Sequence, residues 1–473
     1  MSDKAAPADP AQMPPSREGW GEELRATFML AWPLVIAQLA QNALHTTDVI
    51  LLGWLGPAYL AAGTLGTTFF MPFLLFGVGV AGAVAPLVAQ ARGARNIKAI
   101  RRIVRQGFWA AIVLATLLLP LVLQIKPIYH FLGQDPVATD MAEQFIQIVA
   151  WSLFPAIGII VLRSFLSAFD ATRAILVITV LGVVVNAAIA YALIFGNFGL
   201  PRLELRGAAI ATLTTNIVMF LVMLAYVIRH RRFGRFHILM RFWKPDWGHF
   251  RSIFAIGTPI ALTVLAEVGM FTAAALLMGR IGIDEVAAHA VALQSASMAF
   301  MVPLGLGIAA TVRVGIAYGR RDREGIRKAG WMAFLLGTGF MVISCLAFLF
   351  FGRPIVSVFL DPGVEANANA VGLAVSFLAI AGIFQLVDGA QVTAAHALRG
   401  LSDTKIPMVL AIVGYWMVGL PTSYVLGFVF DWRGVGIWTG LAVGLTFVAI
   451  VLLTRFALRE RLGLLERIGV PRA

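Results

Sequence analysis

The chain has 473 residues, of which 60% are hydrophobic and only 13% are charged, whereas an ordinary soluble domain carries roughly 25% charged residues. This composition excludes an ordinary soluble protein. The formal net charge of +13 could indicate a nucleic-acid partner, but in a membrane protein a basic excess marks the loops that face the cytoplasm. The only cysteine is Cys345, so an intramolecular disulfide and a thiolate metal cluster are also excluded.

After residues 1–24, which we expect to be a cytoplasmic tail, long apolar runs recur from Phe28 to Leu458. A run of about 20 apolar residues crosses the hydrocarbon layer as a helix. The stretch from Phe334 to Phe351 lacks the alternation of a barrel strand. The sequence therefore predicts an all-α polytopic membrane protein of about twelve transmembrane helices. The expected spans centre near Ile36, Phe70, Val113, Ile157, Val183, Val218, Leu265, Ala299, Met341, Phe384, Val413 and Thr446.

Basic residues gather after every second span, in the stretches 92–105, 229–244 and 320–328. The positive-inside rule assigns these loops, and with them both chain ends, to the cytoplasm. This distribution explains the net charge without nucleic acid. We expect a multi-pass protein of a bacterial inner membrane, in contact with membrane lipid and monomeric.

The two halves of the sequence repeat each other at one fixed spacing. A register held without gaps through two spans is not expected by chance, and six spans per repeat, an even number, give both repeats the same orientation in the membrane. We therefore predict an N-terminal lobe (25–230), a cytoplasmic linker (231–250), a C-terminal lobe (251–458) and a tail (459–473). The matched pairs, whose positions all differ by 226, include Pro33 with Pro259, Gly53 with Gly279, Gly79 with Gly305, and Gly93 with Gly319.

Three carboxylates lie within predicted spans, where an ionisable side chain is costly and is a functional candidate by default. Asp48 lies in the first span, Glu267 in the seventh and Asp388 in the tenth. We expect Glu267 and Asp388 to meet as a cation-coupling site in the second lobe and Asp48 to act separately in the first. The alternative is a structural hydrogen bond or salt bridge to a neighbouring helix.

Polar side chains accompany two of these carboxylates at helical spacing. Gln38, Gln41, His45 and Asp48 share one stripe of the first span, which should face the bundle interior. In the tenth span Gln385 and Gln391 flank Asp388 at intervals of three residues. These amides, His45 and Asn186 of the fifth span are weaker candidates for lining a substrate cleft, since amides also join helices by hydrogen bonds.

A buried carboxylate pair with amide oxygens suits either a proton or a hard cation such as Na⁺, and the sequence does not choose between them. We expect no cofactor beyond this coupling ion. No Walker A pattern, nucleophile elbow or metal-ligand set occurs in the chain, so ATP hydrolysis and enzymatic activity are not predicted. Arg163, Arg313, His289 and His396 lie near predicted span ends, where snorkelling or an interfacial hydrogen bond is the expected role.

Several motifs together resemble the multidrug and toxic compound extrusion (MATE) family, in particular its NorM-type bacterial branch. The resemblance runs nearly end to end and is most specific after Asp388. It rests on Thr47-Asp48-Val49, Phe76-Gly77-Val78-Gly79, Pro259 with Glu267, Val286-Ala287-Ala288-His289, Arg313-Val314-Gly315, Leu398-Arg399-Gly400, Tyr415-Trp416 and Gly419-Leu420-Pro421-Thr422.

The resemblance implies a two-lobe antiporter that exports small organic cations in exchange for Na⁺ or H⁺. It also implies that Glu267 and Asp388 bind the coupling cation and that Asp48 takes part in proton or substrate coupling. A flippase for lipid-linked envelope precursors is the alternative, because related transporters share the two-lobe plan. The acidic charges within the spans favour cationic cargo over an anionic pyrophosphate head group.

Overall fold

The computed structural model describes residues 19–197, 199, 201–361, 363–364 and 367–466. Within these residues no strand occurs, and twelve helical segments are long and apolar enough to cross a membrane. Each of the expected span centres lies inside one of these segments. The prediction of an all-α protein with about twelve transmembrane helices is therefore confirmed.

The first half of the chain folds into six spans and short accessory helices. One span combines α2 and α3, and another combines α6 and α7 through a 3₁₀ turn, Ala150–Ser152. The helices are α1 (Trp20–Leu55), α2 (Pro57–Ala81), α3 (Val84–Gly93), α4 (Ile97–Val122), α5 (Ile125–Phe131), α6 (Pro136–Val149), α7 (Leu153–Ala168), α8 (Thr172–Phe195), α9 (Glu204–Arg229) and α10 (Arg231–Gly234).

The second half repeats this plan with one irregular span. That span, Lys405–Val429, contains two π-helical segments, Val413–Gly419 and Val425–Val429, a form that often accompanies functional sites. The helices are α11 (Trp247–Ile281), α12 (Ile283–Gly319), α13 (Arg323–Phe350), α14 (Gly352–Ser357), α15 (Ala368–Gly400), α16 (Lys405–Ile412), α17 (Leu420–Tyr424) and α18 (Arg433–Ala457).

Two helix starts lie inside segments predicted to be tail or linker. α1 begins at Trp20, within the stretch 1–24, because Glu22 accepts a hydrogen bond from the backbone N–H of Gly19 and caps the first turn. α11 begins at Trp247, within the stretch 231–250, because the Asp246 carboxylate caps it. Residues 1–18 of the first tail and 467–473 of the second lie outside the described residues.

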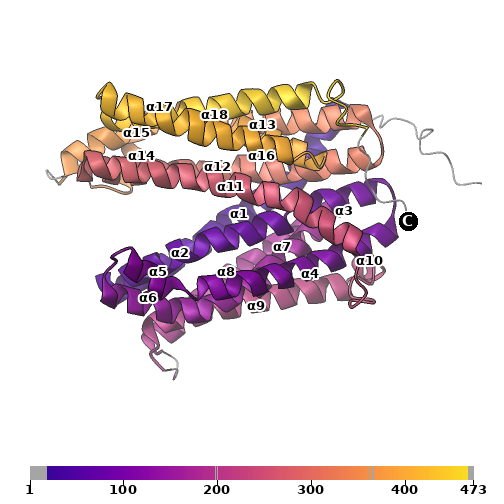
Figure 1. The fold of residues 1–473 in the computed structure, drawn as a ribbon, viewed down its shortest axis with the longest axis horizontal. Coiled ribbons are helices and arrows are strands. Elements are labelled where there is room, and N and C mark those ends of the chain that lie inside the picture. Colours follow the sequence, from indigo (N-terminus) through magenta and orange to yellow (C-terminus); the bar gives the residue numbers. More distant parts are fainter. Residues whose placement is uncertain (1–18, 198, 200, 362, 365–366, 467–473) are drawn as a thin grey trace, which may run out of the picture.

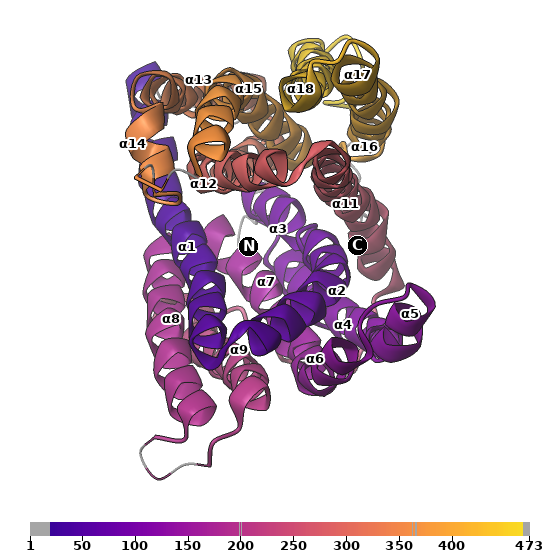
Figure 2. The same ribbon diagram turned by 90° about the vertical axis from the view of Figure 1, so that its left-hand side faces the viewer.

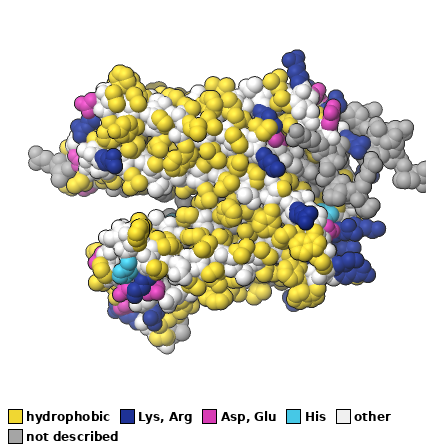
Figure 3. All heavy atoms as spheres, in the orientation of Figure 1, with side chains coloured by type: hydrophobic (Ala, Val, Ile, Leu, Met, Phe, Trp, Pro, Cys, Tyr) yellow, Lys and Arg dark blue, Asp and Glu magenta, His cyan; other side chains and the backbone are white. Residues whose placement is uncertain are grey.

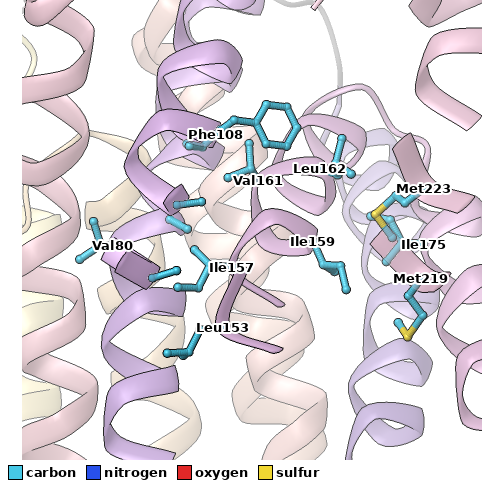
Figure 4. Packing of buried hydrophobic residues seen from close by; sticks show 14 of the residues in the cluster. Val80, Phe108, Leu153, Ile157, Ile159, Val161, Leu162, Ile175, Met219 and Met223 are labelled. Carbon is cyan, nitrogen blue, oxygen red and sulfur yellow. The ribbon is translucent and has the colours of Figure 1, made fainter. Parts of the chain in front are cut away.

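The helices form two groups that lie side by side, α1–α9 in one and α11–α18 in the other (Figures 1 and 2). Each group has its own buried apolar core. In the first, Ile157 of α7 and Met219 of α9 are among the side chains that fill the space between helices (Figure 4). We call the two groups the first and second lobes. Their correspondence to the two sequence repeats agrees with the predicted two-lobe plan.

The lobes meet where repeat-related residues pack against each other. α3 crosses the end of α12 so closely that a Cβ atom on Gly93 would lie 2.1 Å from the carbonyl oxygen of Ile316. A Cβ on its repeat mate Gly319 would lie 2.0 Å from the carbonyl oxygen of Gln90. Only glycine permits this approach of two backbones. The sequence repeat therefore also appears in space, as a pseudo-twofold contact between lobes.

A second contact follows the same symmetry. Gly79 of α2 packs against Ala261 of α11, and its repeat mate Gly305 of α12 packs against Val35 of α1. Since Val35 and Ala261 are themselves repeat mates, the two contacts are equivalent halves of one interface. Each lobe thus contributes its first two spans to the junction between the lobes.

The two ends of the molecule differ. At the end that holds α3 and α10 the lobes touch, and many basic side chains gather there, whereas toward the end that holds α5 and α14 a groove separates the lobes (Figures 1 and 3). We call these the closed end and the open end. Large apolar side chains such as Trp54 of α1 and Leu276 of α11 are exposed in the helix halves that lead to the open end.

Substituting Gly319→Ala should disrupt the closed end. The added methyl meets backbone atoms that cannot rotate away, so we expect a loss of roughly 1–3 kcal/mol of stability, as for other overpacked sites, and a lower midpoint of thermal unfolding. Gly339→Ala on α13 is the matched control, because nothing lies within 4 Å of its added methyl and alanine favours the helix. Equal unfolding midpoints for the two variants would contradict this packing.

Candidate functional site

Asp48 is the centre of a hydrogen-bonded cluster in the first lobe. The Asn186 side-chain amide of α8 donates to its Oδ1 at 2.7 Å, and the Thr212 hydroxyl of α9 donates to its Oδ2 at 3.2 Å. Thr215 in turn donates to the amide oxygen of Asn186 at 3.2 Å. Three helices therefore converge on one carboxylate. Neutral donors stabilise the ionised form without cancelling its charge, which leaves this cluster able to attract a cation.

The polar stripe of α1 divides into residues with different surroundings. Gln38 accepts a hydrogen bond of 2.6 Å from the Arg163 guanidinium of α7, so its amide is used inside the first lobe. Gln41 and His45 are exposed. Arg163, expected to snorkel or to make an interfacial hydrogen bond, joins α7 to α1 through this bond.

Glu267 and Asp388 both lie in the second lobe, near enough for their charges to interact. Glu267 is half-buried near the middle of α11, and Asp388 of α15 has only 6% of its surface exposed. The charge of Glu267 acts on Asp388. Two carboxylates from different helices are thus directed to one region of an apolar bundle. Two negative charges cannot share such a region at low cost without a proton or another cation.

Two oxygen atoms at this acidic pair accept no hydrogen bond from any residue in the described part of the chain. They are Asp388 Oδ1 and Gln391 Oε1, both buried. The amide nitrogen of Gln391 donates to the Tyr415 hydroxyl at 2.7 Å, which fixes the direction of the amide oxygen. A buried oxygen without a donor is costly. A bound cation would remove that cost, and a proton on Asp388 would remove it at Oδ1.

The irregular span helps to build the same region. Tyr415 and Trp416 belong to the π-helical segment Val413–Gly419. The Trp416 indole N–H donates to the carbonyl oxygen of Ala266 at 3.1 Å, next to Glu267 in α11. The π-helical turn thereby aligns one side chain with Gln391 and the next with the backbone beside Glu267.

A basic group also belongs to the second-lobe site. Arg399, at the end of α15, exerts its charge on Glu267. One of its guanidinium nitrogens lies 3.1 Å from His396 Nε2, and His396 is held in turn by the Thr311 hydroxyl of α12, which donates to its carbonyl oxygen at 2.9 Å. Arg399, which is positioned by His396, thus offsets part of the negative charge of the acidic pair. His396 is an internal partner here and not a snorkelling side chain.

Three of the weaker cleft candidates are enclosed between helices in this structure. Asn186 and Gln385 are 0% exposed and Gln391 is 2% exposed. Gln385 accepts a hydrogen bond of 2.8 Å from the Ser344 hydroxyl of α13. Helix packing around small neighbours closes over these amides, which the spacing of polar residues along one helix could not reveal. That they line a substrate cleft therefore stays a prediction.

The remaining polar candidates join helices. Arg313 of α12 forms a two-pronged salt bridge with Glu23 of α1, a carboxylate only 3% exposed that also accepts from the Thr27 hydroxyl. This ion pair links the two lobes at the closed end. His289 is buried against Trp438, with ring centroids 5.4 Å apart.

No group of three or more His, Cys, Asp or Glu side chains that could hold a metal ion occurs among the described residues. Thr212, Arg399 and Tyr415 were missed as site residues. A hydroxyl or an arginine near a helix end occurs too often along a polytopic chain to be singled out. Tyr415 and Arg399 lie in motifs that carried the family resemblance, which was the available signal.

Comparison with known proteins places this geometry in a family. The MatE family model matches residues 33–192 and 259–425, two segments that begin at the repeat mates Pro33 and Pro259. A "Probable multidrug resistance protein NorM" of Mesorhizobium japonicum is 44% identical over 94% of this chain and 96% of its own length. A protein of the same name from Brucella suis is 45% identical over 92% of this chain and 93% of its own.

Solved structures agree on the fold. A eukaryotic MATE transporter is 21% identical and covers 95% of this chain and 100% of its own, with a TM-score of 0.84. A multidrug resistance MATE family transporter in an outward-facing conformation is 20% identical and covers 95% of this chain and 98% of its own, also at 0.84. A Pyrococcus furiosus transporter, described as having a binding pocket of reverse polarity, is 20% identical. It covers 94% of this chain and 97% of its own, with a TM-score of 0.84.

Substituting Tyr415→Phe should destabilise the second lobe. Without the hydroxyl, the buried amide of Gln391 loses its acceptor, and an unsatisfied buried polar group costs roughly 1–3 kcal/mol. We expect a lower midpoint of thermal unfolding in detergent than for the wild type. Tyr424→Phe on α17 is the control, because Tyr424 is 49% exposed. The proposed role of the hydroxyl would be wrong if the two variants unfolded at the same temperature.

Proposed function

We propose that this chain, which belongs to the MatE family and is a multi-pass membrane transporter of the multidrug type, exports amphipathic organic cations in exchange for Na⁺ or H⁺. The observation that carries the proposal is the pair of donor-free acceptor oxygens, Asp388 Oδ1 and Gln391 Oε1, in the region where Glu267 acts on Asp388. Oxygen ligands of this kind suit a hard cation, and the carboxylates alone suit a proton.

The sign of the charges in the spans supports cationic cargo. The fold does not decide the cargo, since a transporter of the same fold is described with a pocket of reverse polarity and a different suggested function. In this chain, Asp48 in one lobe and the pair of Glu267 and Asp388 in the other give each lobe an acidic centre. A flat organic cation would gain from these charges and from cation–π contact with aromatic side chains.

Competition between cations supplies the coupling. A coupling ion that occupies the second-lobe site lowers the negative charge available to a cationic drug, so the drug is released while the ion is held. An ion shifts the conformational equilibrium only by its difference in affinity for the two states. The carboxylates of Glu267 and Asp388 are the groups whose occupancy changes.

The closed end faces the cytoplasm in this proposal, because basic loops mark that face. The structure is then open to the outside. Alternating access requires the closed end to separate, which means breaking the pseudo-twofold glycine contact and the ion pair of Glu23 with Arg313. The ion pair has no equivalent in the repeat, since His249 and Leu87 occupy the corresponding positions. It therefore adds one asymmetric contact to the otherwise pseudo-twofold junction at the closed end.

Removing this ion pair should shift the protein away from the outward-open state. Glu23→Gln removes the charge attraction between α1 and α12, at a cost on the order of 3 kcal/mol, or roughly a hundredfold in population. Spin labels at positions 95 and 321, both exposed near the closed end, should report longer distances in a Cys345→Ser background. The exchanged pair Glu23→Arg with Arg313→Glu should restore part of the short-distance population. Unchanged distances in Glu23→Gln would show that the pair does not hold the end closed.

Ethidium efflux from proteoliposomes tests cargo and coupling together. In the wild type, one inward gradient, of Na⁺ or of protons, should drive efflux and thereby identify the ion. Glu267→Gln should lower ion-driven efflux at least tenfold, because a neutral amide gives up the ionic charge on which coupling depends.

Asp361→Asn, on an exposed loop, is the matched charge control and should keep wild-type efflux. Full ion-driven efflux by Glu267→Gln would disprove the assigned coupling site. If neither gradient moved the dye through folded wild-type protein, organic-cation export would be wrong, and transport of lipid-linked precursors would be measured next.

A further inference from the structure

The segment that joins the two lobes is fastened to α4 by its backbone. Three α4 side chains donate to three carbonyl oxygens of this segment: Arg105 to Arg241 at 3.0 Å, Trp109 to Phe242 at 3.0 Å, and Gln106 to Lys244 at 3.5 Å. The Trp109 and Phe242 rings also stack, with centroids 5.4 Å apart. Because the three donors hold only backbone atoms, the charged side chains of Arg241 and Lys244 remain exposed.

The segment runs along the flank of the bundle and not across its end. Trp109 lies 12 residues after Ile97, the first residue of α4, which corresponds to about 18 Å of helix at 1.5 Å per residue. Residues that contact Trp109 therefore lie well down the side of a transmembrane helix. The charged residues of α4 end at Arg105, and residues 106–122 contain none, so α4 enters the apolar layer close to Trp109, and a side chain that points outward there meets the lipid headgroups.

The outward side chains have the composition of a membrane interface. Trp243 is 80% exposed, Trp247 is 64% exposed and Met240 is 50% exposed. Between them Arg241 and Lys244 are also exposed. Exposed tryptophans are unusual on a surface in water but are enriched at the headgroup level of membranes, where the ring is apolar and the N–H is polar.

The charge around these side chains is strongly positive. Residues 101–106 and 240–246 contain five basic side chains, Arg101, Arg102, Arg105, Arg241 and Lys244, and one acidic side chain, Asp246. The Asp246 carboxylate already caps α11 and lies 3.7 Å from Arg102. The bond from Arg105 goes to a carbonyl oxygen, which carries no net charge. The basic excess of this region is therefore not neutralised by the one carboxylate that it contains.

We propose that the exposed face of this segment and of the start of α4 binds the headgroup of an anionic phospholipid. We call this face the linker surface; it consists of Arg102, Met240, Arg241, Trp243, Lys244 and Trp247. The two tryptophans lie at the headgroup level, and the basic groups contact the phosphate. The rigid backbone attachment to α4 means that little order is lost when the lipid binds. The site also lies where the first lobe ends and α11 begins, so a bound lipid contacts both lobes. This inference requires only that the chain spans a membrane and does not depend on the transported cargo.

The site is tested by native mass spectrometry of the delipidated full chain, titrated with phosphatidylglycerol or with phosphatidylcholine of the same acyl chains. We expect tighter binding of phosphatidylglycerol to the wild type. Arg241→Gln with Lys244→Gln should weaken phosphatidylglycerol binding roughly tenfold or more, because it removes two of the positive charges that attract the anionic headgroup. Phosphatidylcholine binding should change less than about twofold, because its headgroup carries no net charge.

The matched control is Arg320→Gln with Arg321→Gln, which removes two exposed basic groups from another loop at the closed end. It should leave phosphatidylglycerol binding within about twofold of the wild type. An equal loss in both double variants would overturn the proposal in favour of a general effect of surface charge. Equal affinity of the wild type for the two lipids would also overturn it.

Two further measurements separate a lipid from a soluble anion. Trp243→Ala should weaken phosphatidylglycerol binding while leaving all basic groups in place, which a purely electrostatic site would not show. Glycerol phosphate, the soluble headgroup analogue, should not displace the bound lipid at equal concentration. Displacement by glycerol phosphate would identify a site for soluble phosphates and would contradict the assignment to membrane lipid.

Discussion

A charge inside an apolar helix bundle must have a partner, and this requirement governs where the polar groups of the protein lie. Arg163 and Gln38 satisfy each other within the first lobe, and Glu23 and Arg313 do so between lobes. Asp48 has only neutral donors. At the site of Glu267 and Asp388, acceptor oxygens remain without donors in the described structure. The acidic centres are thus the places where the protein lacks its own positive charge or donor and where binding of a cation is favourable.

The duplication explains how these centres can sit in two lobes that move. Repeat-related glycines bring the lobes into backbone contact at one end, while Figure 3 shows the groove between them at the other. A glycine interface has no interlocking side chains that would have to be pulled apart. The asymmetric ion pair of Glu23 and Arg313 then adds a preference for one state to a junction that is otherwise nearly symmetric.

Much of the fold could be predicted because its determinants are local. Span length, the basic loops and the fixed spacing of the repeat are all readable along the chain, and the burial cost of a charge singled out Asp48, Glu267 and Asp388. The hydrogen-bond partners could not be predicted, because nothing along the chain distinguishes Thr212 and Tyr415 from other hydroxyl residues. Only the packing of the helices brings them to Asp48 and Gln391. Helix ends at Trp20 and Trp247 depended on caps that the apolar pattern does not show.

The central claim is that the coupling ion and the cationic drug compete through Glu267 and Asp388. The most direct measurement is the equilibrium affinity of purified protein for ethidium as Na⁺ concentration or pH is varied, in the wild type and in the double variant Glu267→Gln with Asp388→Asn. The account predicts that in the wild type the Kd for ethidium rises as Na⁺ or protons are added, and that in the double variant the Kd no longer depends on either ion. An equally strong ion dependence in the double variant, or none in the wild type, would contradict it.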